Sequence, residues 1–332
     1  MSKVFSQIGR GRALQGAAAG VVVLGLLLWW LLPLGEDPPS GTITFSTGTP
    51  RGVYQEYGTW LRDELAKDMP GLHVILESSN GSQDNVERVA KGEADFTIAA
   101  ADAVQSYESR NPSAAARLRG VARLYDDYVQ LLVPRDSDVR SVADLKGKTV
   151  ATGLPGSGVR LIANRVLEAA GLDPQKDVTA VDKGINNGPQ ALRQGTIDAF
   201  FWSGGIPTGG LTDLAKTFAF RFVPIDATLV AKMHSQDSST SYYRTTNMSE
   251  SVYRSVQNGE TVPTIAVSNV MITRTDMDPR LTEWMTRVVI KSRDEIGARV
   301  HSAQLVDLRT AIDTNPLPLH EGARRYYRSV KP

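Results

Sequence analysis

A strand, a glycine-rich loop and a helix occur in this order twice along the chain. In the first copy, residues 42–45 alternate in polarity as a strand does, and the loop Ser46–Gly52 follows. A helical pattern begins at Val53, with apolar residues at three- and four-residue spacing. Gly48 and Gly52 allow a sharp turn and a close approach to a ligand. Because unpaired N–H groups and the positive end of the helix dipole meet there, this loop favours an anion.

The second copy runs from a strand at residues 148–153 into the loop Leu154–Gly158, and a helical pattern follows as far as Gly171. After each helix, a strand, a short helix and a turn ending in aspartate repeat, the turns being Gly92–Asp95 and Gly195–Asp198. We therefore predict two similar α/β lobes, each presenting a glycine loop to one cleft. The alternative is that these are ordinary Gly-rich turns, which are common in α/β proteins.

Length and composition exclude several classes of protein. A chain of 332 residues exceeds one ordinary core, so two domains are expected. The formal net charge of +1 argues against nucleic acid as a partner. The absence of cysteine excludes disulfides, thiolate metal sites and a lipid-modified N-terminal cysteine. The four histidines lack metal-ligand spacing, and we expect neither a metal site nor a cofactor.

The N-terminal segment has the pattern of a membrane anchor. Residues 1–12 contain three basic side chains, and the apolar run 13–34 is long enough to span a bilayer as a helix. The positive-inside rule places residues 1–12 in the cytoplasm and the chain beyond the linker 35–41 outside it. The run is long for a signal peptide and no Ala-x-Ala-like site follows, so we expect an uncleaved single-pass anchor. If it is cleaved, the protein is secreted.

The remaining chain divides into two predicted lobes. Residues 42–130 together with 276–332 form the first lobe, and residues 131–275 form the second. A strand at residues 262–272 is expected to return beside Leu131–Val133. Residues 235–251 are polar and rich in Ser, Thr and Tyr, and are predicted to be mostly loop.

Polar residues follow or interrupt several predicted strands. The segment Glu77–Asn85 ends a strand and starts a short helix, so its side chains could bind a ligand or simply cap the helix. A buried strand from Phe96 to Ala101 ends at Asp102. The strand Leu124–Val133 contains an acidic interruption and is expected to cross out of the first lobe. The glycines after Trp202 follow another strand, at the edge where open α/β sheets bind ligands.

Several motifs together resemble the solute-binding subunits of TRAP transporters of the TAXI family. Such proteins begin with a Thr-Gly-rich loop that runs into Tyr and then Gly, here Thr47, Gly48, Gly52, Tyr54 and Gly58. Their motif Glu-Ser-x-Gly-Ser-x-x-Asn is similar to Glu77–Asn85, which has one extra residue. The other similar stretches, which together span about residues 42–330, are Gly92–Asp95, Ser141–Gly147, Pro155–Gly158, Gln194–Phe201, Val262–Thr264, Pro318–His320 and Gly322–Tyr327.

The resemblance implies an α/β fold of the type II periplasmic-binding-protein kind, with two lobes around a cleft. The lobes close on a small organic solute, often an amino acid or a carboxylate such as glutamate. The expected partner is an integral membrane TRAP permease driven by an ion gradient. The absence of Gly-x-x-x-x-Gly-Lys-Ser/Thr fits a chain that does not hydrolyse nucleotide.

The chain departs from the TAXI pattern near the expected site. Thr49, Pro50 and Arg51 replace some of the usual glycines, and Ala100 stands where a glutamine is common. An arginine can pair a carboxylate through two hydrogen bonds, so we hypothesise that Arg51 contacts an acidic ligand. The alternative is a solvated arginine at the cleft rim.

The solute is expected between the two glycine loops, with its carboxylate near Ser157 and Gly158 and an aromatic wall around it. The expected ligand-binding residues are Gly48, Thr49, Arg51, Gly52, Val53, Tyr54, Ser79, Asn85, Ala101, Asp102, Tyr125, Ser157, Gly158, Val159, Trp202, Ser203 and Gly204.

Two other classes of protein are alternatives to a solute-binding protein. An enzyme with Ser157 as nucleophile needs a base, but Pro155–Gly158 lacks the first glycine of Gly-x-Ser-x-Gly and no histidine has an evident place. We therefore expect no catalytic residue and no enzyme. A membrane-anchored sensing module would have the same fold and ligand site, and would pass the ligand-bound state to a signalling partner.

Overall fold

The computed structural model describes residues 20–23 and 37–331, and the chain divides into two units, residues 1–38 and 39–332. The predicted cytoplasmic segment 1–12 lies outside the described residues, as does most of the predicted membrane segment 13–34, of which residues 20–23 are helical. No helix in the described part of the chain is long and apolar enough to cross a bilayer.

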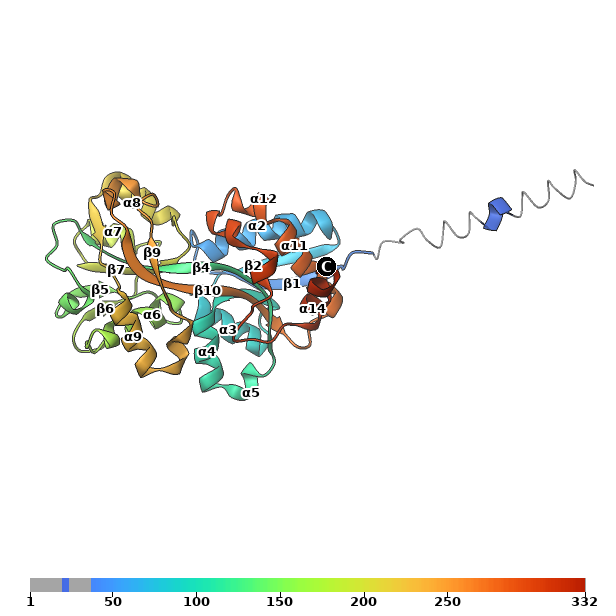
Figure 1. The fold of residues 1–332 in the computed structure, drawn as a ribbon, viewed down its shortest axis with the longest axis horizontal. Coiled ribbons are helices and arrows are strands. Elements are labelled where there is room, and N and C mark those ends of the chain that lie inside the picture. The colour runs from blue at the N-terminus through green and yellow to red at the C-terminus, as the bar shows by residue number, and fades with distance from the viewer. Residues whose placement is uncertain (1–19, 24–36, 332) are drawn as a thin grey trace, which may run out of the picture. The chain divides into compact units, whose positions relative to one another are not determined.

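Within residues 39–331, ten strands form one hydrogen-bonded sheet (Figure 1). Its order is β2-β1-β3-β10-β4-β7-β5-β6, with β8 paired to β4 and β9 paired to β10. The strands β2, β1 and β3 are parallel, as are β7, β5 and β6, whereas β10 and β4 between them are antiparallel to their neighbours. The strands are β1 (Gly41–Ser46), β2 (Leu72–Glu77), β3 (Phe96–Ala100), β4 (Leu118–Pro134), β5 (Thr149–Ala151), β6 (Thr179–Val181), β7 (Ala199–Gly204), β8 (Phe220–Phe222), β9 (Arg244–Met248) and β10 (Val262–Arg274).

The long strands β4 and β10 join the two parallel sets. They contain 17 and 13 residues and pair from Ala266 opposite Tyr128 to Arg274 opposite Leu118. The sequence correctly predicted a returning strand, but its expected position beside residues 131–133 is wrong, because these residues pair with β7 and β8. The strand β4 is long enough to serve different antiparallel partners along its length.

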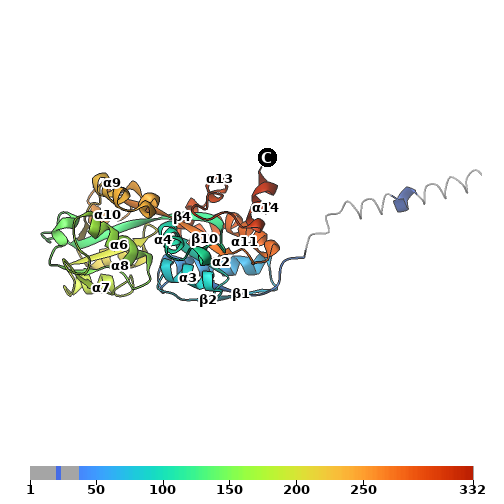
Figure 2. The ribbon, with the colours of Figure 1, turned by 90° about the horizontal axis from the view of Figure 1, so that it is seen from below.

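Helices cover the sheet, and Figure 2 shows α7 and α9 on opposite sides of the part that contains β5, β6 and β7. The helices are α2 (Val53–Asp68), α3 (Ser82–Lys91), α4 (Ala101–Arg110), α5 (Pro112–Ala115), α6 (Gly158–Ala169), α7 (Gly188–Arg193), α8 (Gly209–Thr217), α9 (Ala227–Gln236), α10 (Arg254–Gln257), α11 (Pro279–Lys291), α12 (Arg293–Gly297), α13 (Leu308–Ala311) and α14 (Glu321–Val330). Short 3-10 helices are η1 (Val142–Leu145), η2 (Ser238–Tyr242) and η3 (His301–Leu305).

Three predicted boundaries differ from the structure. The strand β1 begins at Gly41, inside the predicted linker 35–41. Ala101 is the first residue of α4 and not the end of a strand. The polar segment 235–251 is not mostly loop, because it contains the end of α9, all of η2 and all of β9. Its polar sequence carries little strand signal, and the ladder to β10 supplies the hydrogen bonds that fix it.

Two large hydrophobic cores lie within the sheet and its helices. The first core packs α2 against β1, β3, α11 and α14, and its α2 stripe is Tyr57, Leu61 and Leu65. The second core surrounds β5, β7, α6 and α9, with Ile162 and Phe200 fully buried. Both β4 and β10 contribute residues to each core, so these strands connect the two.

Candidate functional site

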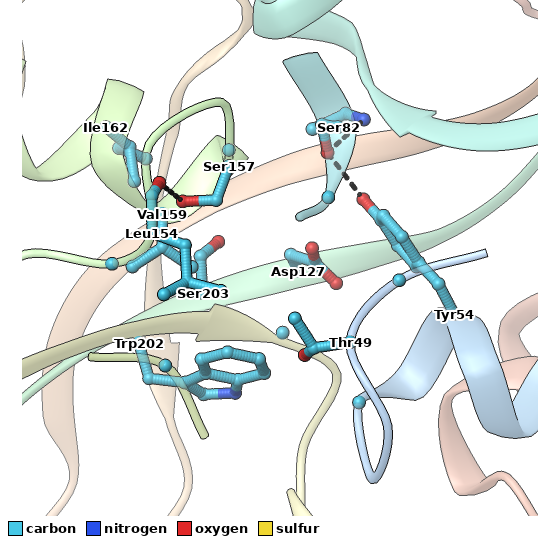
Figure 3. A pocket seen from close by; sticks show the side chains of 18 of the residues that line it. Thr49, Tyr54, Ser82, Asp127, Leu154, Ser157, Val159, Ile162, Trp202 and Ser203 are labelled. Atoms are coloured by element: carbon cyan, nitrogen blue, oxygen red, sulfur yellow. Dashed lines mark hydrogen bonds between the residues drawn. The ribbon is translucent and has the colours of Figure 1, made fainter. Parts of the chain in front are cut away.

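A cavity lies between the two cores, where the loop after β1 faces the loop after β5 (Figure 3). The space between its walls is about 690 Å³ when the open solvent at its mouth is included. The lining residues are Gly48, Thr49, Gly52, Val53, Tyr54, Asn80, Gly81, Ser82, Ala100, Asp102, Asp127, Gly153, Leu154, Ser157, Gly158, Val159, Ile162, Gly184, Trp202, Ser203, Gly204 and Val267.

Several helices begin at this cavity. The first residues of α2, α3, α4 and α6 are Val53, Ser82, Ala101 and Gly158, and each is a lining residue or the neighbour of one. The first N–H groups of a helix have no acceptor within that helix, and its dipole is positive at this end. The cavity wall can therefore hold an anionic group without a cationic side chain.

The start of α3 touches the second glycine loop, Leu154–Gly158, on one side of the cavity. The backbone N–H of Asp84 donates to the carbonyl of Gly156 at 3.0 Å, and the Gln83 side chain donates to the carbonyl of Ser157 at 2.8 Å. A Cβ atom at Gly81 would lie 3.5 Å from the Ser157 Cα. These contacts between α3 and the loop before α6 close this side of the cavity.

Gly153→Ala should destabilise the protein more than Gly171→Ala. Both glycines have positive φ, +87° and +83°, which alone costs an alanine about 1–2 kcal/mol. A Cβ at Gly153 would also lie 2.8 Å from the Val159 Cβ, whereas no described atom lies within 4 Å of a Cβ at Gly171. Urea unfolding of both variants measures the difference, expected to be about 1 kcal/mol or more. Equal losses would show that the loop relaxes around the added methyl group.

Tyr54 and Ser82 form one polar edge of the cavity. The Tyr54 hydroxyl lies 2.9 Å from the Ser82 Oγ and donates to the Oδ1 of Asn269. The Ser82 Oγ also accepts from the backbone N–H of Ala100 at 3.2 Å. Burial, reinforced by Asp127, raises the pKa of Tyr54 well above its usual value, so its phenol stays neutral.

Asp102 is a buried carboxylate with partners behind the cavity. Its Oδ2 accepts from the Tyr243 hydroxyl at 2.7 Å and lies 3.7 Å from a guanidinium nitrogen of Arg165. The same Tyr243 oxygen accepts from Arg165 at 2.8 Å. Burial raises the pKa of Asp102, and Arg165 and Tyr243 oppose this rise. Asp102 is thus held from α6 and from the residue that follows η2.

Asp127 is a second buried carboxylate, placed in the middle of the cavity (Figure 3). It is 5 % exposed, and its Oδ1 has no hydrogen-bond partner among the described residues. Burial raises the pKa of Asp127 to about 7, Asn269 opposes the rise, and Asp126 and Asp102 add to it.

Within residues 37–331, no group of three or more His, Asp and Glu side chains is arranged to hold a metal ion.

The structure brings most of the predicted ligand-binding residues to the cavity wall. Trp202 lies on one side of the cavity and Tyr54 on the other (Figure 3). Ligand contact by any of these residues remains a prediction. The predicted residues that line the cavity are Gly48, Thr49, Gly52, Val53, Tyr54, Asp102, Ser157, Gly158, Val159, Trp202, Ser203 and Gly204.

Four other predicted residues lie behind the cavity wall. The Ser79 hydroxyl donates to the carbonyl of Thr47 at 2.8 Å and so shapes the first loop. The Asn85 side chain is fully buried and donates to the carbonyl of Ile98 at 2.9 Å. Tyr125 packs on other aromatic residues of the first core, and Ala101 is buried in the first turn of α4. The polar groups of Ser79 and Asn85 are thus used by the fold, whereas the buried hydroxyl of Tyr125 has no hydrogen-bond partner among the described residues.

Arg51 also lies outside the cavity lining. Its backbone has a φ of 64°, and its guanidinium lies 3.5 Å from the carboxylate of Asp213 on α8, with both side chains mostly exposed. The ion pair bridges the first loop and α8 in solvent. The predicted contact with an acidic ligand remains untested.

Arg51→Ala should change ligand affinity by less than about fivefold, because an exposed ion pair contributes at most about 1 kcal/mol. Isothermal titration of the variant and the wild-type protein with the same ligand measures this. Asp213→Ala is the matched control, since it removes the same ion pair from the other side. A tenfold loss in Arg51→Ala alone would instead support the direct ligand contact that the sequence suggested.

Sequence reasoning missed other lining residues. Asp127 lies in the acidic interruption of the strand Leu124–Val133, which was recognised but given no role in the site. Gly81 and Ser82 lie in the polar segment Glu77–Asn85. Leu154 and Gly153 flank a recognised loop. Gly184, Ile162 and Val267 had no local signal. The missed lining residues are Asn80, Gly81, Ser82, Ala100, Asp127, Gly153, Leu154, Ile162, Gly184 and Val267.

The mixed α/β sheet, the two cores and the cavity between them define the fold class of the periplasmic binding proteins. The sequence model of the NMT1-like family matches residues 45–330, and the chain therefore belongs to that family.

Solved structures of low sequence identity share the fold. A putative L-cystine ABC transporter protein from Listeria monocytogenes is 15% identical with a TM-score of 0.51, covering 80% of this chain and 98% of its own. A periplasmic transporter structure is 13% identical with a TM-score of 0.52, covering 80% and 88%. The periplasmic aliphatic sulphonate binding protein from Escherichia coli is 14% identical, and the match covers 89% of this chain and 84% of its own. Its TM-score of 0.45 is too low to support a conclusion. At these identities the likeness concerns the fold alone.

Proposed function

We propose that this chain is an extracytoplasmic solute-binding protein, not an enzyme, which captures a small organic solute and delivers it to a membrane permease. The observation that carries the proposal is the cavity, whose wall is built from glycine loops and helix starts of both cores. A molecule in it contacts Tyr54 and Ser82 from one side and Ser157 and Trp202 from the other. The solute makes all four of these contacts only when the two sides of the cavity close around it.

This arrangement supports hinge closure as the mechanism. The residues 42–130 with 276–332 act as one lobe and residues 131–275 as the other, a division supported by the two cores. The strands β4 and β10 connect the lobes, and the C-terminal return of β10 supports the type II assignment. A solute that contacts both lobes stabilises the closed state, whereas one that contacts a single lobe equally in both states shifts nothing.

The proposed partner is a TRAP permease driven by an ion gradient. Support comes from the ordered TAXI motifs, which include the two loops that face each other across the cavity. A solved protein of the same fold carries the name of an ABC transporter, so an ATP-driven permease is the alternative partner. We further propose that residues 13–34 anchor the protein in the cell membrane, on the basis of their length and apolar character.

Isothermal titration of the full-length chain tests the proposal. The protein is first unfolded and refolded to remove any co-purifying solute, and is titrated with glutamate, glutamine, aspartate, 2-oxoglutarate and succinate. We expect saturable binding of one compound at micromolar affinity or better, which corresponds to about −8 kcal/mol. If none binds and no small molecule co-purifies with untreated protein, the solute-binding function is wrong.

Two tryptophan variants serve as a matched pair in this titration. Ser203→Trp places an indole in the cavity and is expected to abolish binding, because Ser203 lines the wall. Ser251→Trp makes the same change at an exposed position and should leave binding intact. Retention of binding by Ser203→Trp would place the solute elsewhere.

A further inference from the structure

The charge balance of the cavity lining indicates what its solute must carry. Among the described residues that line the cavity, the charged side chains are Asp102 and Asp127, and no Lys, Arg or His is among them. Arg165 accompanies Asp102 from behind, at 3.7 Å. No ion pair involving Asp127 occurs within residues 37–331, so its negative charge is not compensated by the protein.

The position of Asp127 is fixed by the sheet. The pairing of β4 with β10 is irregular between Ser268 and Val270, close to Asp127 and Asn269. Irregular pairing of this kind turns side chains in new directions and is common beside binding sites. Asp126, the neighbour on the other face of β4, pairs with Arg123 at 2.9 Å and with Arg244. The two adjacent aspartates thus differ in that only one has cationic partners.

Two of the buried polar atoms that lack a hydrogen-bond partner belong to neighbouring side chains on adjacent strands. The Oδ1 of Asp127 and the Nδ2 of Asn269 have no hydrogen-bond partner in the described part of the chain, and both atoms are buried. Asn269 is fully buried and accepts from Tyr54, so its side chain is held in place. The Asn269 side chain favours the ionised form of Asp127, but burial outweighs it, so a ligand that supplies a further partner stabilises the carboxylate.

We propose that Asp127 binds a protonated amino group of the solute, which selects amine-bearing solutes over plain dicarboxylates. The inference rests on the proposed solute-binding function and narrows it. The helix starts at Ser82 and Gly158 can hold an anionic group of the same molecule, so a zwitterion matches both Asp127 and these helix starts. This assigns a role to the acidic interruption in β4 and requires no cationic side chain in the cavity.

A pH profile separates an ionised Asp127 from a neutral one. The titratable groups that face Asp127 are Asp102 from α4, Tyr54 from α2, and Asp126 and Tyr125 from β4. Both tyrosines stay neutral because burial raises their pKa, so the acids set the charge. Since the pKa of Asp127 is raised to about 7, binding of an ammonium group should weaken as the pH falls from 8 to 5. A neutral Asp127 that donates a hydrogen bond gives the opposite trend.

The experiment compares matched solutes on matched variants of the full-length, refolded protein. A thermal-shift screen pairs the common amino acids and small amines with the hydroxy acids, oxo acids and alcohols that lack the nitrogen. Each compound that binds is then titrated against wild type, Asp127→Asn and Asp126→Asn. We expect binders to carry a protonatable nitrogen, an affinity loss of about 100-fold or more in Asp127→Asn, and less than about twofold in Asp126→Asn.

Each outcome decides the proposal. Tight binding of a compound without a basic nitrogen, or unchanged amine affinity in Asp127→Asn, overturns the amine assignment while solute binding stands. Amine binding that strengthens as the pH falls also overturns it. If no compound binds and mass spectrometry finds no co-purifying solute, the proposed function fails and the inference fails with it. Should Asp127→Asn not fold, the wild-type pH profile and the paired compounds still decide.

Discussion

Asp127→Asn should make the ligand-free protein more stable at pH 8 than the wild type, and by a smaller margin at pH 5. The folded-state pKa of Asp127 is raised from 3.8 to about 7, mainly because the side chain is buried. Between pH 3.8 and about pH 7, the folded protein therefore holds a proton that the unfolded chain has already released. The contribution of Asp127 therefore lowers the free energy of unfolding progressively as the pH rises from about 4 to 7. Above about pH 7 this loss stays constant.

The size of this effect follows from the same pKa. One pKa unit corresponds to about 1.4 kcal/mol, so the penalty above pH 7 is at most about 4 kcal/mol. We expect the gain from Asp127→Asn to be about 2–3 kcal/mol larger at pH 8 than at pH 5. Urea unfolding of both proteins at the two pH values measures the gain. Destabilisation by Asp127→Asn at pH 8 would contradict the prediction and would mean that Asp127 has a partner in the protein.

Asp126→Asn is the matched control for this measurement. Asp126 is one residue away and pairs with Arg123 and Arg244, so its removal should not stabilise the protein at either pH. A variant that gains stability while it loses solute affinity is typical of a binding residue, because such residues are selected for ligand contact and not for the ligand-free fold. If Asp127 had only a structural role, Asp127→Asn would lower both the free energy of unfolding and the solute affinity.

The loops and helix starts of the site could be predicted from the sequence because their signals are local. Gly48 and Gly52 precede a helical pattern, and Ser157 precedes another, so each loop is visible within a short window. In the structure, both of these loops contribute residues to the cavity wall. Gly184 and Val267 reach the cavity through chain reversals and long-range pairing, which no local pattern encodes.

Side-chain direction was harder to predict than position. Ser79 and Asn85 have the chemistry of ligand contacts, but their groups satisfy backbone carbonyls of the first loop and of β3. Arg51 has the chemistry to bind a carboxylate, yet its guanidinium meets Asp213 in solvent. The pair Asp126 and Asp127 was visible as an interruption, but which one faces the cavity depends on the irregular register with β10.

Arg165→Met should destabilise the protein by about 3–5 kcal/mol at pH 8, the range for removing one partner of a buried ion pair. Arg165 is 11% exposed, and Asp102, its partner, is 2% exposed. The arginine also donates to Tyr243, and it lies 3.4 Å from the carboxylate of Asp237. Methionine fills a similar volume but leaves the buried Asp102 without a cationic partner, so that the Tyr243 hydroxyl and backbone N–H groups alone stabilise its charge.

A double-mutant cycle isolates the ion pair in this network. Asp102→Asn in the Arg165→Met background should recover part of the lost stability, since the uncompensated charge is then gone. Arg62→Met is the surface control, because Arg62 is 44% exposed beside Asp63, and a loss below about 0.5 kcal/mol is expected. Equal losses in Arg165→Met and Arg62→Met would show that Asp102 does not depend on Arg165. Additive losses in the cycle would place the contribution of Arg165 in its contacts with Tyr243 and Asp237 instead.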